Sequence, residues 1–278
     1  MPRMKRLGAF ALVLLSACGS PQGAALAPRP TYDVHQIASA DLLRQANRGR
    51  TIEGPDGLYV LPKSVRRAWI DVGAHLMEQT AAELRRNEDV AVVAIEPLEE
   101  CWKAWDDNPR LIALPVAIST ERGFLDFQVN AENATSSLLK SVEGNSVSEL
   151  TRTVQVRKVP VLRLQDVLER IPPGVDVEFL KTDVQGHDLQ VLRSAGEQIR
   201  RVERVQVEII NEPIYAGSGE WKPGTEDEFV SYMQGKGFRF EGDSNVRSKR
   251  EWLDKHFVNS ARSGFIAQTR KRFRSLLP

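Results

Sequence analysis

Three acidic residues, Asp71, Glu96 and Asp183, each stand where an apolar segment of strand length ends. The segments are residues 69–75 (Trp-Ile-Asp-Val-Gly-Ala-His), 92–97 (Val-Val-Ala-Ile-Glu-Pro) and 177–186 (Val-Glu-Phe-Leu-Lys-Thr-Asp-Val-Gln-Gly). Continuous apolar runs of this kind are typical of parallel strands, because helices cover both faces of a parallel sheet. Ligands of such sheets bind beyond the carboxyl ends of the strands, so we expect the three carboxylates to gather at one ligand site.

The residues around these acids have matching uses. Gly73 would let the backbone approach a ligand closely, and the helix expected after it would offer unpaired N–H groups to a carboxylate or hydroxyl. Glu96 lies 25 residues beyond Asp71, near the spacing at which an acidic residue accepts both ribose hydroxyls in nucleotide-binding α/β folds. Taken singly, each acid is explained as well by a helix N-cap or a surface salt bridge. Their combination indicates a nucleoside cofactor.

The elements that must position these residues alternate along the chain. The patterns predict strands that end at Asp71, Glu96 and Asp183, and further strands over residues 111–118, 123–130, 154–162, 205–210 and 264–268. Helices are predicted over residues 80–86, 98–105, 164–170, 188–195 and 226–235. Upstream, residues 32–47 read as helical and residues 51–60 as a hairpin around a Gly-Pro-Asp-Gly turn. This alternation predicts one α/β domain with a mainly parallel sheet.

Composition narrows the class of protein. The chain has 278 residues, of which 41% are hydrophobic and 27% charged, as in an ordinary soluble globular protein with one full core. Its 38 basic and 37 acidic residues nearly cancel, so no overall field favours nucleic acid, and we expect no nucleic-acid partner. No Cys/His spacing indicates a structural zinc site, and no metal is expected.

The N-terminus has the layout of a secretory signal. Arg3, Lys5 and Arg6 precede an apolar run over residues 7–15, and Leu-Ser-Ala-Cys follows at residues 15–18. That tetrapeptide resembles the bacterial lipobox, which predicts a signal peptide over residues 1–17, lipidation of Cys18 and a tether over residues 18–31. The protein would then be a lipoprotein anchored to the membrane in the bacterial cell envelope. The alternatives are a chance apolar start or a misplaced initiation site, in which case the protein would be cytoplasmic.

Longer motifs carry a resemblance to a known family. Residues 71–80 read Asp-Val-Gly-Ala-His-Leu-Met-Glu-Gln-Thr, and residues 180–192 read Leu-Lys-Thr-Asp-Val-Gln-Gly-His-Asp-Leu-Gln-Val-Leu. With the Glu-Pro pair at residues 96–97, Ser-Ser-Leu at 136–138 and Glu208 at the end of a later strand, they occur in a fixed order. Over roughly residues 67–270 the chain resembles the FkbM-type methyltransferases, whose corresponding motifs are Asp-Val-Gly-Ala-Asn-x-Gly-x-x-Thr and Leu-Lys-Ile-Asp-Val-Glu-Gly.

The resemblance implies a fold and an activity. The fold class would be α/β, a Rossmann-like class I methyltransferase fold with a mainly parallel seven-stranded sheet, helices on both faces and an antiparallel last strand. Residues 67–278 would form this domain, and residues 32–66 a helix and hairpin extension. The activity would be methyl transfer from S-adenosyl-L-methionine, usually to an oxygen of a sugar, a polyketide or a similar small molecule.

The resemblance also distributes roles among the candidate residues. Cofactor binding falls to Asp71, Gly73, Ala74, His75, Glu96 and Pro97. Asp183 and His187 are the candidate catalytic bases, because an acceptor hydroxyl must lose its proton during attack. Glu208 and Tyr215 are candidates for contact with the acceptor. Each of the last three has a structural alternative: His187 as a helix cap, Glu208 as a partner of backbone N–H groups, and Tyr215 as the anchor of its own loop.

Departures from the family motifs support a second hypothesis. His75 replaces the family's Asn, Met77 its second Gly, and Gln185 its central Glu, which removes a charge. The Met77 side chain would either obstruct the cofactor or pack aside. Because S-adenosylmethionine is made in the cytosol, the signal also conflicts with catalysis. The alternative is an exported, catalytically degenerate lipoprotein that acts as a binding protein. A dehydrogenase is disfavoured, since no Gly-x-Gly-x-x-Gly sequence lies near Gly73.

Overall fold

The computed structural model describes residues 33–247 and 252–262. The predicted signal peptide, Cys18, the tether and the strand predicted over residues 264–268 lie outside these ranges. Within them, no helix has both the length and the apolar character needed to cross a membrane.

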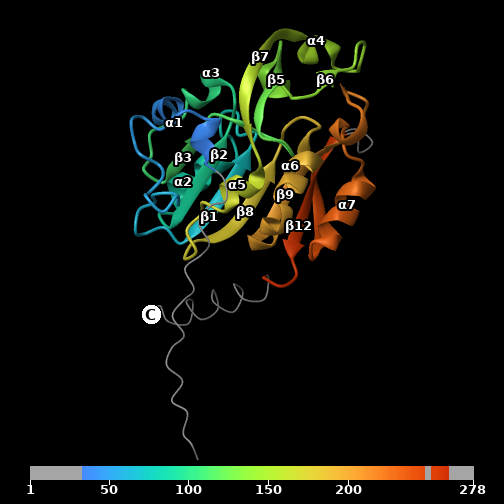
Figure 1. The fold of residues 1–278 in the computed structure, drawn as a ribbon. Helices are drawn as coiled ribbons and strands as arrows, with labels where there is room; N and C mark the ends of the chain where they lie inside the picture. Colours follow the sequence, from blue (N-terminus) through green and yellow to red (C-terminus); the bar gives the residue numbers. More distant parts are fainter. Residues whose placement is uncertain (1–32, 248–251, 263–278) are drawn as a thin grey trace, which may run out of the picture.

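A seven-stranded sheet forms the centre of the molecule (Figure 1). Its strands, in spatial order, are β11 (Phe238–Arg247), β12 (Trp252–Asn259), β9 (Val202–Ile210), β8 (Asp176–Thr182), β1 (Arg67–Val72), β2 (Val90–Ile95) and β3 (Leu111–Leu114). The pairs from β9 to β3 are parallel, and β12 runs antiparallel to both of its neighbours. The predicted mainly parallel sheet with an antiparallel last strand is therefore confirmed among the described residues.

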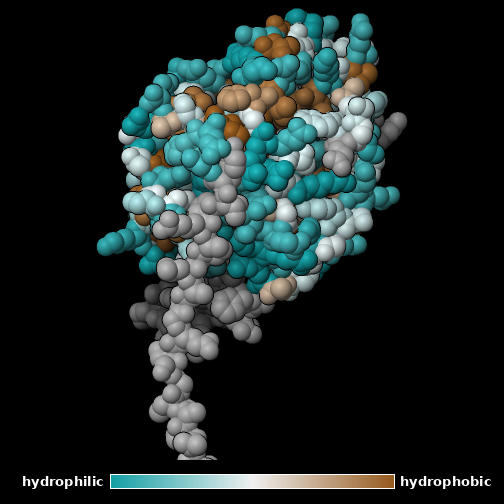
Figure 2. Space-filling view, in the orientation of Figure 1, coloured by the Kyte–Doolittle hydropathy of each residue, from teal (hydrophilic) through white to brown (hydrophobic). Residues whose placement is uncertain are grey.

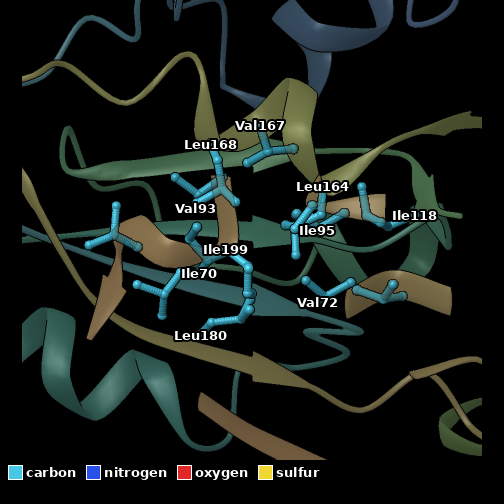
Figure 3. Close-up of a cluster of buried hydrophobic side chains, with 14 of the residues drawn as sticks. Ile70, Val72, Val93, Ile95, Ile118, Leu164, Val167, Leu168, Leu180 and Ile199 are labelled. Carbon is cyan, nitrogen blue, oxygen red and sulfur yellow. The ribbon is translucent and has the colours of Figure 1, made fainter. Parts of the chain in front are cut away.

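Alternation along the central strands divides the core between the two faces of the sheet. Ile70, Val72, Val93 and Ile95 point into the larger cluster, which Figure 3 shows from within. Val92 and Ala94 point into the second cluster, on the opposite face of the sheet. The larger cluster is covered by α5 (Leu164–Leu168), α6 (Asp188–Ser194) and α7 (Glu226–Gly235), and the second by α2 (Thr80–Arg86) and α3 (Glu99–Trp102). Burial on both faces explains why these strands read as continuous apolar runs.

A smaller sheet lies beyond the carboxyl ends of the central strands. It consists of β4 (Ala117–Ile118), β7 (Thr153–Leu162) and β5 (Gly123–Asn130), and Figure 1 shows β5, β7 and α4 (Ser148–Thr151) at the top of the view. The single strand predicted over residues 111–118 was wrong. It breaks at Pro115, which has no N–H to donate, so β3 stays in the main sheet while β4 joins the small one.

The small sheet carries an apolar surface. Figure 2 shows hydrophobic atoms over the upper part of the molecule, where Figure 1 places β5, β7 and α4. Phe124, Leu150, Val154 and Val156 are among the exposed large apolar side chains there. Between this sheet and the main one, β6 (Lys140–Ser141) pairs with β10 (Tyr215–Ala216).

The N-terminal extension packs against the main core. It contains η1 (Val34–Gln36) and α1 (Ala40–Ala46), which Ser39 caps, and Val34 and Leu43 belong to the larger cluster. The hairpin predicted over residues 51–60 is reduced to one bridge between Glu53 and Tyr59. Glu53 also accepts a hydrogen bond of 2.7 Å from Arg170, just past α5. These contacts join the extension to the sheet's covering helices.

Gly73 permits the tightest crossing in the sheet. It follows β1 with φ of +75°, and a Cβ at this position would stand 1.9 Å from the carbonyl oxygen of Asp183. The sequence predicted that this glycine makes room for a ligand. In the structure it makes room for the backbone at the end of β8, so its first function is to bring Asp71 and Asp183 side by side.

Replacing Gly73 with Ala should lower the free energy of unfolding by roughly 3 kcal/mol or more, because backbone strain adds to the clash with Asp183. Gly144→Ala is the matched control: Gly144 also has positive φ, +72°, but open space around it. The control should lose only about 1 kcal/mol, the cost of the left-handed backbone. Urea unfolding measures both. Equal losses in the two variants would show that the crossing at Gly73 is not as tight as described.

Candidate functional site

A cavity of about 670 Å³ opens at the carboxyl ends of β1, β2 and β8, beneath the small sheet. It gathers most of the predicted site residues: Asp71, Gly73, Ala74, His75, Glu96, Pro97, Asp183, His187 and Glu208 all line it. Tyr215 does not, and Cys18 lies outside the described residues. The far wall was not predicted in detail; it comes from the loop and helix after β5, including Asn133, Leu138 and Leu150.

Glu96 joins the loops that follow β1 and β2. Its Oε2 accepts a hydrogen bond of 3.1 Å from the backbone N–H of His75, and its Oε1 one of 2.9 Å from that of Leu98. Burial raises the pKa of Glu96 to about 7, although both backbone hydrogen bonds favour the charged form. Each carboxylate oxygen accepts more than one hydrogen bond, so the group retains capacity for two ligand hydroxyls. The remaining acceptor capacity of Glu96 fits the two hydroxyls of a ribose at the cavity wall.

His75 links the β1 loop to the short helix η2 (Asn133–Thr135), which follows β5. Its φ is +43°, its Nδ1 lies 2.8 Å from Glu78 Oε1, and its Nε2 lies 2.9 Å from Asn133 Oδ1. Burial lowers the pKa of His75, but the hydrogen bonds to Glu78 and Asn133 outweigh it, and the net pKa is raised. The His75 carbonyl accepts from Trp105 Nε1 at 2.7 Å. The residue therefore positions the cavity wall through both its ring and its backbone.

Lys181 places a positive charge between two of the predicted acids. Its Nζ lies 3.4 Å from Asp71 Oδ1 and 3.3 Å from Asp183 Oδ2, and Thr80 donates to Asp71 Oδ2 at 2.7 Å. Lys181 is buried, while the Asp183 side chain is 33% exposed and opens into the cavity. Sequence reasoning gave Lys181 no role, although residues 181 and 183 of one strand share a face. The two-residue spacing of Lys181 and Asp183 could therefore have predicted that their side chains lie together.

Asp183 and Glu208 form an asymmetric acid pair. Loss of hydration raises the pKa of Asp183, but the charge of Lys181 and hydrogen bonds from Gln185 and Glu208 hold it below its usual range. Loss of hydration and the charge of Asp183 together raise the pKa of Glu208 well above its usual range. The surroundings therefore favour the charged form of Asp183 and the neutral form of Glu208.

His187 is a neutral, almost fully enclosed side chain at the start of α6. Burial lowers its pKa to about 4. Its Nε2 lies 3.0 Å from Ser119 Oγ, and its ring packs on Trp221 with centroids 5.1 Å apart. Its Nδ1 is buried and has no hydrogen-bond partner among the described residues, yet the residue lines the cavity. A buried nitrogen of this kind is suited to a hydrogen bond with a bound ligand.

Tyr215 has the structural role that the sequence left open beside ligand contact. It is 4% exposed and belongs to a small apolar cluster with Leu139, Ile210 and Ile214. Its hydroxyl points at protein acceptors behind the cavity wall. The ring therefore anchors its loop, and any effect on the acceptor would be indirect.

Met77 leaves the cavity open. Its φ is +59°, a left-handed value that glycine adopts without strain. The side chain is 3% exposed and packs in the second cluster with Ala74, Leu84 and Trp102. Met77 does not line the cavity, so of the two expectations for this residue the structure shows the one in which it packs aside. In the described ranges, no group of three or more His, Cys, Asp and Glu side chains is placed to hold a metal ion.

Comparison with known proteins gives one family. Residues 71–240 match the model of the methyltransferase FkbM domain. A search of curated proteins finds no match. Among solved structures, 1,6-didemethyltoxoflavin-N1-methyltransferase of Burkholderia thailandensis is 11% identical over 70% of this chain and 72% of its own, with a TM-score of 0.37. Magnesium protoporphyrin IX methyltransferase of Synechocystis PCC 6803 is 8% identical over 71% and 76%, with a TM-score of 0.38.

Replacing Glu96 with Gln should change how stability depends on pH. The native pKa of Glu96, about 7, lies above its ordinary value of 4.5, so the folded state holds the proton longer than the unfolded state does. The native chain therefore loses stability as pH rises from about 5 through about 7, by up to roughly 3 kcal/mol. The Gln variant escapes this loss, and its stability relative to the native chain should rise over that range. Glu99→Gln, at an exposed position of α3, is the control and should give parallel curves; parallel curves for Glu96→Gln would contradict the prediction.

Proposed function

Because the chain belongs to the FkbM methyltransferase family and uses S-adenosyl-L-methionine as its methyl donor, we propose that it methylates a hydroxyl oxygen of a sugar or other small-molecule acceptor. The observation that carries this proposal is the Asp183 carboxyl, which opens into the cavity 3.3 Å from the Lys181 ammonium group. An acceptor hydroxyl needs a group that removes its proton, and this carboxylate is held in the form that can do so.

The loops after β1 and β2 are suited to hold the cofactor. When bound, S-adenosylmethionine supplies a methyl group on a carbon that the sulfonium already activates. Glu96 would accept the ribose hydroxyls, while its own contacts to the N–H groups of His75 and Leu98 fix the wall against which they lie. Asp71 does not offer an unopposed charge, because Lys181 and Thr80 engage it. We therefore assign Asp71 to ordering the loop and Glu96 to direct contact.

The acid pair is suited to the acceptor side. Asp183 would take the proton of the acceptor hydroxyl while the hydroxyl oxygen attacks the methyl carbon. Lys181 would stabilise the ionised Asp183 carboxylate beforehand. Glu208 lines the cavity beside Asp183, and its hydrogen bond to Asp183 helps to keep that carboxyl in the charged form. His187 is neutral and its Nε2 contacts Ser119, so its Nδ1 is better placed to orient a ligand than to compete as base.

The far wall favours an acceptor with an apolar part. Leu138, Val147 and Leu150 line the cavity opposite the acids, and Leu150 also reaches the exposed apolar surface of the small sheet. A sugar with an aglycone or a polyketide would present both a hydroxyl and an apolar face. The exported binding protein without catalysis is not favoured, because Met77 does not block the cavity and the family match covers the site.

We propose the location of the protein from its sequence alone. The charged start, the apolar run and Cys18 are in register, which supports a lipoprotein anchored in the cell envelope. Such a location requires that S-adenosylmethionine reach the protein, or that methylation precede export. Mass spectrometry of the protein from membranes would show lipid on Cys18 if the signal is used and an unmodified N-terminus if it is not.

Asp183→Asn should lower methyl transfer by about a hundredfold to ten-thousandfold, because the amide cannot accept the proton. The assay follows tritium from methyl-labelled S-adenosylmethionine into fractionated small molecules of the cell. Binding of S-adenosylmethionine should be retained, since Lys181 keeps Asp71 as its partner. Asp126→Asn, on the exposed face of the small sheet, is the control and should transfer at the native rate. Native activity in Asp183→Asn would remove this residue from the reaction, and a native chain that labels no small molecule would contradict the proposed function.

A further inference from the structure

Gln185 is held in an unusual backbone conformation directly after the acid-bearing strand. Its φ is +56°, a left-handed value that is uncommon for a residue with a side chain, and the side chain is 6% exposed. Ser137 Oγ donates to the Gln185 carbonyl at 2.9 Å. Strain of this kind persists only where surrounding contacts fix it, and it is concentrated at functional sites. The contacts of the amide show what the conformation achieves.

The Gln185 amide bridges the acid pair. Its Nε2 donates to Asp183 Oδ1 at 2.9 Å and to Glu208 Oε2 at 2.9 Å, so both of its N–H groups are used. Its Oε1 lies 3.0 Å from the Tyr215 hydroxyl, whose single proton it shares with the Thr135 carbonyl at 2.7 Å. A phenol that donates on one side and two carboxyl oxygens that accept on the other define which end of the amide is nitrogen.

The groups around the pair decide where its proton resides. Besides the pair itself, the titratable and charged groups that face it from the neighbouring elements include Asp71, Lys181, Asp188 and Tyr215, and Asp254 of β12, which lies opposite Glu208 across the sheet. Ionisation of one acid disfavours ionisation of the other, because like charges in contact repel in a poorly hydrated site. Lys181 lies 3.3 Å from Asp183, and the charges of Asp183 and Asp188 both disfavour ionisation of Glu208. The charge therefore resides on Asp183.

We propose that Gln185 is a positioning residue for the base: its amide bridges Asp183 and Glu208 and fixes the Asp183 carboxylate at the cavity. This inference rests on the proposed function for the identity of the base. An amide supplies two donors without adding a charge. A Glu at the same position, as in the family motif, would remove both donors and add a third acid that must itself hold a proton.

Gln185→Glu tests the proposal through its linkage to protons. The new acid should have a raised pKa in the folded state, so its contribution to stability is present at low pH and is lost as pH rises. The unfolding equilibrium constant, relative to the native chain, should rise about tenfold for each pH unit between about pH 5 and pH 7. Gln234→Glu, at an exposed position of α7, makes the same chemical change and should give a constant ratio. A constant ratio for Gln185→Glu would overturn the proposal.

Two further measurements address catalysis and folding. The pH profile of tritium transfer should shift its acidic limb upward by about one pH unit in Gln185→Glu and by less in Tyr215→Phe, which frees the amide oxygen. An unshifted acidic limb in a folded Gln185→Glu variant would overturn the positioning role.

If Gln185→Glu does not fold, Gln185→Ala replaces it. Loss of the two amide donors should raise the pKa of Asp183, so the unfolding equilibrium constant relative to the native chain should again rise with pH. A constant ratio would again overturn the proposal. If no chain transfers a methyl group, the proposed function fails, while the stability curves still decide the role of Gln185.

Discussion

The ammonium group of Lys181 between Asp71 and Asp183 is the interaction on which the site depends. It joins the two central strands, β1 and β8, at their carboxyl ends, within 3.4 Å of one carboxylate and 3.3 Å of the other. Removing one partner from a buried pair leaves an uncompensated charge, so Lys181 and the fully buried Asp71 must be present together. Their proximity in turn requires Gly73, because no Cβ fits where the two strand ends cross. The close backbone approach at Gly73 and the ion pairs of Lys181 thus lie at the same place, the carboxyl ends of β1 and β8.

The residues that depart from the family motifs keep the geometry of that point. His75, Met77 and Gln185 all have positive φ, although none of them is glycine. Each side chain then has a role: His75 contacts Asn133 after β5, Met77 packs in the second apolar cluster, and Gln185 bridges the acid pair. The substitutions therefore adjust the walls and the protonation of the cavity without closing it, which agrees with an active enzyme rather than a degenerate one.

Sequence alone predicted what depends on local patterns. Apolar runs that end in Asp71, Glu96 and Asp183 located the strand ends and the cavity, because burial on both faces leaves a plain signature. It did not predict β11 and β12, where the pattern is interrupted by Lys255, a buried cation that lies 2.8 Å from Asp243. Nor did it predict the partners of the acids: the Lys181 contacts and the Gln185 bridge depend on side chains that meet only after β1, β8 and β9 are assembled. Long-range polar contacts of this kind have no period in the sequence.

Calorimetric titration of S-adenosylmethionine into the native chain and Glu96→Ala tests the central claim, that the cavity at the carboxyl ends of β1, β2 and β8 holds the cofactor. The account predicts saturable binding to the native chain that weakens by roughly tenfold to a hundredfold in the variant, the loss expected for hydrogen bonds to a charged group. Glu99→Ala, which changes an exposed acid of the next helix, should bind as the native chain does. Absence of binding to a folded native chain, or equal affinity in Glu96→Ala, would contradict the account.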